Sequence, residues 1–211
     1  MTFCLLSGAA LVLASGAMAL GLADGGVRRA VHLALARRLR GPFSPRLVVV
    51  GDSLAAGCPW SRLDRRPFAV LNLAEGGATI RQIAGQVYAA RDFPDATLLI
   101  DGGLNDLLFD GSTLDRFDAD YGALFRRAAQ ARVIVTLMPY TANPADAAMI
   151  TAANAILACL GAERGHAVID LNDVVSQDGV RRPQMTNDGL HFSRDANAAW
   201  IEAARRVLRG P

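Results

Sequence analysis

The sequence has few of the residues that metal sites and disulfide frameworks require. Its 211 residues include three cysteines and three histidines, and lysine is absent, so all 22 cationic side chains are arginine. Cys4, Cys58 and Cys159 are too few and too scattered for a zinc site or a disulfide framework. We expect Cys58 and Cys159 to be small buried hydrophobic residues. The sequence therefore predicts neither a metal nor a cofactor.

An excess of basic charge is also missing from most of the chain. The net charge of +2 hides a division, because residues 1–46 hold six arginines and only Asp24, whereas residues 47–211 hold 16 arginines and 19 acidic residues. A nucleic-acid-binding domain needs a clustered basic face. We therefore expect no nucleic-acid partner. With 52% hydrophobic residues the chain can bury a full core, and we expect one domain over residues 46–211 after an appendage, residues 1–45.

The appendage begins with a stretch that carries no charge from Thr2 to Ala23. This is long enough to cross a bilayer as a helix. A basic segment with helical character, residues 27–41, follows at once, and its arginines suit anionic headgroups. We expect association with a membrane through a retained hydrophobic helix. The alternative is a signal peptide cleaved near Ala17 and Ala19, which would export the domain.

From residue 46 onward, apolar runs alternate with segments of helical composition. The apolar runs, rich in β-branched residues, are 47–50, 69–73, 97–100, 133–138 and 167–171. The segments between and after them are 79–91, 114–130, 145–163 and 194–209. Strict alternation of strand and helix predicts a parallel sheet covered on both faces. The fold class is therefore α/β, a three-layer α/β/α sandwich with five strands.

Ligands of such sheets bind beyond the carboxyl ends of the strands, where this sequence has chemically useful residues. Ser53 follows the first apolar run and Gly77 the second, Asn105 follows the third, and Asp188 and His191 precede the last helical segment. We expect them to converge, because they all belong to one edge of the sheet.

This set of residues is the one that acyl transfer requires. The hydroxyl of Ser53 is a weak nucleophile until a base takes its proton, and His191 has a suitable pKa for that role. Asp188 is placed to fix the tautomer of the imidazole. The backbone N–H groups of Ser53 and Gly77 and the side-chain amide of Asn105 are candidate donors to an oxyanion.

Four short motifs make the chain resemble the SGNH branch of the GDSL hydrolases, which are serine esterases and lipases. They are GDSL at 51–54, the glycine of EGGAT at Gly77, GLND at 103–106 and DGLH at 188–191. The resemblance covers residues 46–209 and implies a flavodoxin-like sheet. It also implies that Ser53 is the nucleophile, that Gly77 and Asn105 are oxyanion donors, and that Asp188 and His191 complete a triad. Where many members have a glycine and an aromatic residue after the histidine, this chain has Asn197 and Ala198.

The predicted function is hydrolysis of carboxylic esters through an acyl-enzyme on Ser53. Short loops and only 6% aromatic residues indicate a short acyl group, such as an acetyl ester of a sugar or glycan. The apolar appendage favours an alternative, a lysophospholipase or thioesterase acting on lipid esters, and an acyltransferase would use the same intermediate. The non-enzymatic alternative is a membrane-tethered binding protein with a decayed site.

Overall fold

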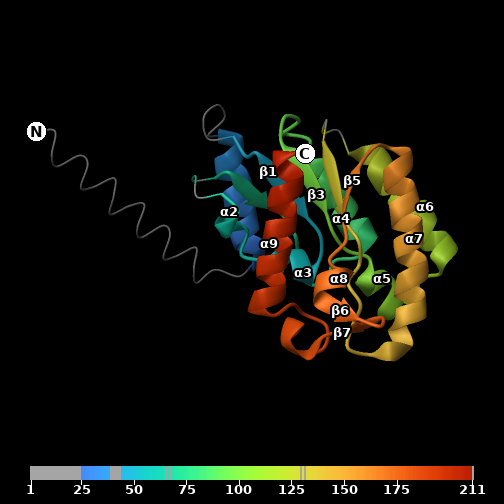
Figure 1. Ribbon diagram of the computed structural model, residues 1–211. Helices are drawn as coiled ribbons and strands as arrows, with labels where there is room; N and C mark the ends of the chain where they lie inside the picture. The colour runs from blue at the N-terminus through green and yellow to red at the C-terminus, as the bar shows by residue number, and fades with distance from the viewer. Residues whose placement is uncertain are drawn as a thin grey trace, which may run out of the picture.

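The core of the computed structural model is one parallel sheet of five strands in the order β2–β1–β3–β4–β5. The structure describes residues 25–38, 44–64, 66, 68–128, 130 and 132–210. The strands are β1 (Leu47–Val50), β2 (Val70–Asn72), β3 (Thr97–Ile100), β4 (Val133–Thr136) and β5 (Ala167–Ile169). The predicted five-stranded parallel sheet is thus confirmed (Figure 1). The three central strands are buried along their whole length, as expected of strands covered on both faces.

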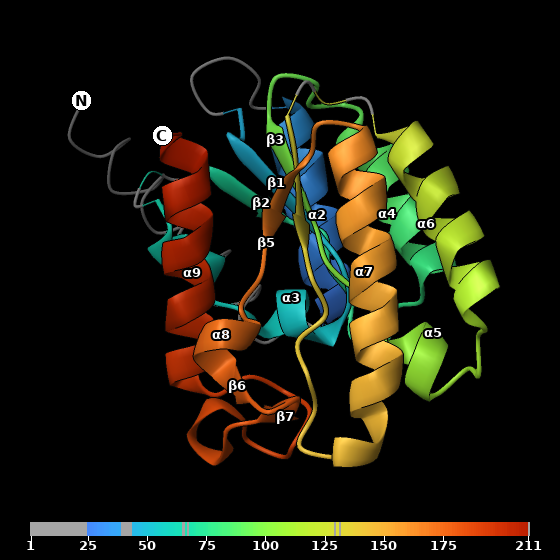
Figure 2. The ribbon, with the colours of Figure 1, turned by 45° about the vertical axis from the view of Figure 1, so that its right-hand side comes forward.

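Long helices cover the sheet on two sides and make the two outer layers of the sandwich. They are α2 (Gly25–Arg38), α4 (Ile80–Ala90), α6 (Leu114–Arg127), α7 (Ala147–Glu163) and α9 (Arg194–Arg209). In Figure 2, α4, α6 and α7 lie on one side of the sheet and α9 on the other. Hydroxyl residues begin three of these helices, since Thr79, Thr113 and Ser193 occupy their N-cap positions.

Short elements gather where the strands have their carboxyl ends, which we call the site end of the molecule. They are α3 (Ser53–Gly57), α5 (Leu104–Leu108), η2 (Pro144–Asp146), α8 (Asn172–Val175), β6 (Ser176–Gln177), β7 (Val180–Arg181) and η3 (Pro183–Met185). A further short element, η1 (Trp60–Arg62), lies on the connection from α3 back to β2. The strands β6 and β7 form an antiparallel hairpin. In Figure 2, α3, α5, α8 and this hairpin lie together at the lower end of the molecule.

Helix α7 is the most apolar of the long helices and packs on the domain along one side. The stretch Pro144–Glu163 is long and apolar enough to span a bilayer, yet α7 packs against the domain through Ile150, Ala153 and Leu157. The prediction that Cys159 is buried is wrong, because it lies on the outer face of this helix and is exposed, whereas Cys58 is buried as expected. The predicted anchor or signal segment, residues 1–23, lies outside the described residues.

Candidate active site

Ser53 is the first residue of α3, directly after the loop that ends β1. The Asp52 carboxylate caps this short helix by accepting a hydrogen bond from the Leu54 N–H at 3.0 Å. Backbone N–H groups in the first turn of a helix have no partner within the helix. The turn therefore presents both the hydroxyl and the backbone N–H of Ser53 at the site end.

His191 and Asp188 lie on the loop before α9 and reach Ser53 from the other side. His191 Nε2 is 3.1 Å from Ser53 Oγ, and His191 Nδ1 is 2.7 Å from Asp188 Oδ2. The other carboxylate oxygen of Asp188 accepts the backbone N–H groups of His191 at 2.7 Å and Leu190 at 3.0 Å. The hydrogen bonds from the His191 ring and from these two N–H groups hold the pKa of Asp188 below its usual range. Asp188 is thus ionised at neutral pH.

Hydrogen bonds within the same loop fix its shape. The Thr186 hydroxyl donates to the His191 carbonyl at 2.8 Å and accepts from the Gly189 N–H at 2.8 Å. The Asn187 side chain donates to the Phe192 carbonyl at 2.9 Å. The position of the His191 imidazole is consequently fixed by the conformation of this loop as well as by the hydrogen bond to Asp188.

Asn105, in α5, connects the loops that carry the two predicted backbone donors. Its side-chain nitrogen donates to the carbonyl of Ala78, the residue after Gly77, at 3.1 Å. The same nitrogen lies 3.5 Å from Asp52 Oδ2, at the outer limit of a hydrogen bond. Gly77 has φ +74°, a left-handed conformation that favours glycine. The structure thus brings Asn105 to the Ser53 loop and the Gly77 loop, with one amide hydrogen weakly engaged.

Three buried carboxyl groups support these loops. Asp106 accepts the Ile80 N–H with both oxygens, at 3.2 and 3.0 Å, and so caps α4. Asp52 and Asp106 thus hold their loops through hydrogen bonds to the backbone. Burial raises the pKa of Asp52 to about 6 and that of Asp101 well above its ordinary value, with the charge of Asp52 adding to the shift at Asp101.

Gly51, the residue before Asp52, lies in a tightly enclosed position. A Cβ atom built on Gly51 would lie 2.9 Å from the Ala55 Cβ and 3.0 Å from the Asp101 carbonyl oxygen. The Gln86 side chain accepts the Gly51 N–H at 2.7 Å and donates to its carbonyl at 3.0 Å. Hydrogen bonds to both the N–H and the carbonyl group of Gly51 therefore fix the backbone between β1 and Ser53.

Arg181 is a buried arginine close to the site. It is only 2% exposed, and its guanidinium carbon lies 4.6 Å from the centre of the Phe192 ring. Its Nη1 donates to the Leu190 carbonyl at 3.4 Å. Burial lowers the pKa of Arg181 to about 10, while the charge of Asp188 opposes the shift. A buried cation thus lies beneath the loop of Asp188 and His191.

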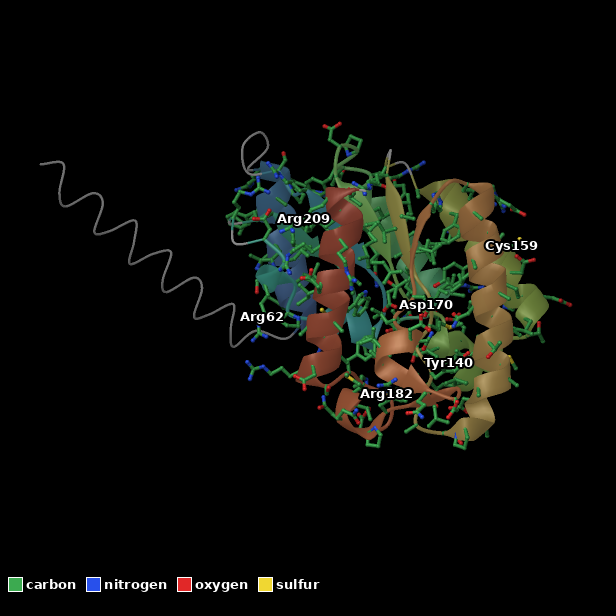
Figure 3. The ribbon with its side chains drawn as sticks, viewed as in Figure 1. Arg62, Tyr140, Cys159, Asp170, Arg182 and Arg209 are labelled. Carbon is green, nitrogen blue, oxygen red and sulfur yellow. The ribbon has the colours of Figure 1, made fainter. Side chains whose placement is uncertain are left out.

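A small cavity opens beside the Ser53 hydroxyl. Its volume is about 240 Å³, and the residues that line it are Ser53, Leu54, Gly57, Asn187, His191, Phe192, Arg194 and Asn197. Three of the lining residues have polar side chains but were not identified as site residues from the sequence motifs. They are Asn187, Arg194 and Asn197. A larger cavity of about 640 Å³ lies at the opposite end of the sheet and includes Arg209 but none of the predicted site residues. Figure 3 shows Arg209 near one end of the molecule and Arg182, next to the hairpin, near the other.

Comparisons with known proteins identify the family and the fold of the chain. The model of the GDSL-like lipase/acylhydrolase family matches residues 49–199. No curated protein matches the chain. Among solved structures, a GDSL-like lipase from Bacteroides thetaiotaomicron has a TM-score of 0.70 at 16% identity, with 86% of this chain and 97% of that chain covered. A lipase/acylhydrolase from Enterococcus faecalis has a TM-score of 0.64 at 21% identity, covering 78% and 96%. An acetyl esterase variant crystallised with acetate has a TM-score of 0.63 at 15% identity, covering 78% and 96%.

Proposed function

This chain belongs to the GDSL-like lipase/acylhydrolase family and is a hydrolase acting on esters, and from that premise we propose that it removes short acyl groups through an acyl-enzyme on Ser53. The observation that carries the proposal is the hydrogen-bonded series from Ser53 Oγ to His191 to Asp188. A serine joined to a base that is itself oriented by a third group is the arrangement of an activated nucleophile.

In the first half of the reaction, Ser53 Oγ attacks the carbonyl carbon of the ester. The hydroxyl proton passes to His191 Nε2, and the positive charge that forms on the imidazole is stabilised by the ionised Asp188. The tetrahedral intermediate collapses when the alkoxide leaves and takes the proton from His191. The acyl group then remains on Ser53 as an ester.

The negative charge on the carbonyl oxygen needs donors that are in place before the reaction. We assign this role to the backbone N–H groups of Ser53 and Gly77 and to the side-chain amide of Asn105. The weak contact between Asn105 and Asp52 leaves one amide hydrogen available for this purpose. Because the second hydrogen bonds to the Ala78 carbonyl, the amide plane is already fixed.

In the second half, water replaces the alcohol. His191 takes a proton from the water as its oxygen attacks the acyl carbon, and a second tetrahedral intermediate forms in the same oxyanion site. Its collapse returns the proton to Ser53 Oγ and releases the carboxylic acid. An acceptor alcohol in place of water would make the same chain an acyltransferase.

The size and lining of the cavity support a short acyl group on a polar alcohol. A volume of about 240 Å³ is below the range of roughly 300–1,000 Å³ of pockets that bind drug-sized ligands. Asn187, Arg194 and Asn197 supply hydrogen-bonding groups beside the hydroxyl of Ser53. The acetyl esterase of similar fold adds a precedent. We therefore favour acetyl esters of a sugar or glycan over lipid esters.

Substitution of the nucleophile tests this function. Ser53→Ala is expected to lower the rate of p-nitrophenyl acetate hydrolysis by about 10⁴-fold or more and to abolish labelling by a fluorophosphonate probe. Ser61→Ala, which alters an exposed serine of the same region, is the matched control. The nearby Cys58 does not substitute for Ser53, because burial raises the pKa of its thiol and keeps it protonated. Wild-type activity in Ser53→Ala would refute the assignment, and an unlabelled native protein would favour a binding protein with a decayed site.

A further inference from the structure

Helix α2 is packed along the edge strand β2. Ala36 is buried in the core, and Leu33 packs against it. Arg29 pairs with Glu75 at 2.6 Å, and Arg37 pairs with Asp92 at 2.7 Å. Exposed ion pairs contribute little to stability, but these two show where the helix lies on the domain. Together the contacts fix α2 against the domain along its length.

The two ion pairs also define the direction of α2. Glu75 follows the carboxyl end of β2 and lies two residues before Gly77, and Arg29 also approaches the Ala74 carbonyl. Asp92 follows α4 and therefore lies at the opposite end of the sheet. Because Arg29 is in the first half of α2 and Arg37 in the last turn, α2 runs antiparallel to β2. Its first residue, Gly25, consequently lies at the site end.

Large apolar side chains are exposed at the same end. Phe109 ends α5, Met149 is in the first turn of α7 and Val174 is in α8, and all three are exposed. Each belongs to a segment that follows the carboxyl end of a strand. Val27, in the first turn of α2, is exposed as well. The site end thus exposes large apolar side chains on several of its segments.

We propose that the site end faces a lipid bilayer, so that the enzyme acts on esters displayed at a membrane surface. The uncharged stretch from Thr2 to Ala23 ends two residues before Gly25, with Asp24 between them, and is long enough to enter a bilayer. A bilayer that holds this stretch lies next to the start of α2, and the exposed Phe109, Met149 and Val174 then meet its interface. The inference rests on the proposed function for the position of the site, and it places a short-acyl ester on a molecule resident in the membrane.

Depth-dependent fluorescence of the full chain tests this orientation. In a background with Cys4→Ser and Cys159→Ser, single cysteines are introduced by Phe109→Cys, Val174→Cys or Tyr88→Cys and labelled with an environment-sensitive dye, while Cys58 remains buried. Tyr88 is the matched control, because it is 70% exposed against 66% for Phe109 and lies near the end of α4 remote from the site. Each protein is reconstituted in phosphatidylcholine and phosphatidylglycerol vesicles that contain a nitroxide-labelled lipid.

The nitroxide lipid is expected to quench the dye at positions 109 and 174 and to leave the dye at position 88 unquenched. Equal quenching at the two ends, quenching at position 88 alone, or failure of the protein to sediment with vesicles would overturn the proposal. A change of fluorescence at positions 109 and 174 that is independent of the nitroxide would assign this face to a second copy and would overturn it too. The readout needs no catalysis, so an inactive protein that shows the expected quenching would refute the proposed function alone.

Discussion

His191 Nε2 lies 3.1 Å from Ser53 Oγ, although 138 residues of sequence separate the two. One residue begins the first short helix after β1, and the other lies on the loop before the last helix. Their distance is therefore set by the sheet and by the groups that hold the second loop, Arg181 among them. A residue that holds this loop can therefore affect the reaction without touching the substrate.

Arg181→Met is expected to lower kcat for p-nitrophenyl acetate by about 10- to 100-fold, because loss of the contacts with Leu190 and Phe192 shifts the loop of His191. Thermal stability is expected to stay equal or to rise, because Nε and Nη2 of Arg181 are buried without a hydrogen-bond partner among the described residues and an unpaired buried charge is costly. Steady-state kinetics and the unfolding midpoint Tm are measured together. Parallel loss of stability and activity would show that Arg181 serves only packing.

Asn105→Ala is expected to lower kcat by about 10²- to 10³-fold with little change in KM, the usual loss for one oxyanion donor. The physical reason is that the side-chain amide matters only after charge develops on the carbonyl oxygen. Initial rates over a range of p-nitrophenyl acetate concentrations separate the two constants. An effect limited to KM would make Asn105 a ground-state binding residue instead.

A series of p-nitrophenyl esters measures the size of the acyl site. Each buried methylene group contributes about 0.8 kcal/mol, so an acyl groove should raise kcat/KM several-fold per carbon until it is full. Because the cavity beside Ser53 is small, we expect the maximum at about two to four carbons under this relation. A maximum at about eight carbons or more would place the lipid-ester alternative first.

Asp52→Asn is expected to change how stability depends on pH. Burial raises the pKa of Asp52 to about 6, above the value of about 3.9 of an unfolded chain. The folded state therefore binds this proton more tightly, and the contribution of Asp52 to stability falls as the pH rises from about 4 to about 6. Two pKa units correspond to about 3 kcal/mol.

The asparagine oxygen can still accept the Leu54 N–H but never becomes charged. We therefore expect the variant to exceed the wild type in free energy of unfolding by about 1–3 kcal/mol at pH 8 and to match it near pH 4. Urea unfolding at the two pH values measures the difference. A difference of the same size at both would contradict the assigned pKa.

The sequence predicted the sheet and the meeting of the site residues well, for a simple physical reason. Buried parallel strands such as Leu47–Val50 appear as short apolar runs, and their carboxyl ends must share one edge. The helices of four and five residues, such as Asn172–Val175, were not predicted, because one turn is too short to show a period.

Other differences arise where burial depends on tertiary contacts. Helix α7 is apolar on nearly every side, so its sequence does not show that Cys159 faces outward. Arg181 is adjacent to another arginine in a polar stretch, and only its packing over the Phe192 ring distinguishes it. The polar lining by Asn187 and Arg194 had no sequence signal for the same reason.

The confined position of Gly51 separates two ways in which this protein can fail in a cell. Because any side chain at this position would collide with Ala55 and with the Asp101 carbonyl, a substitution there acts on folding before it can act on chemistry. Misfolded chains are removed by proteases, so such a variant would be scarce. A substitution of Ser53, which leaves the packing almost unchanged, would instead accumulate as abundant and inert protein. Substitutions of Gly51 and Ser53, two residues of one short motif, would thus both abolish activity. The first would do so through loss of the protein and the second through loss of catalysis.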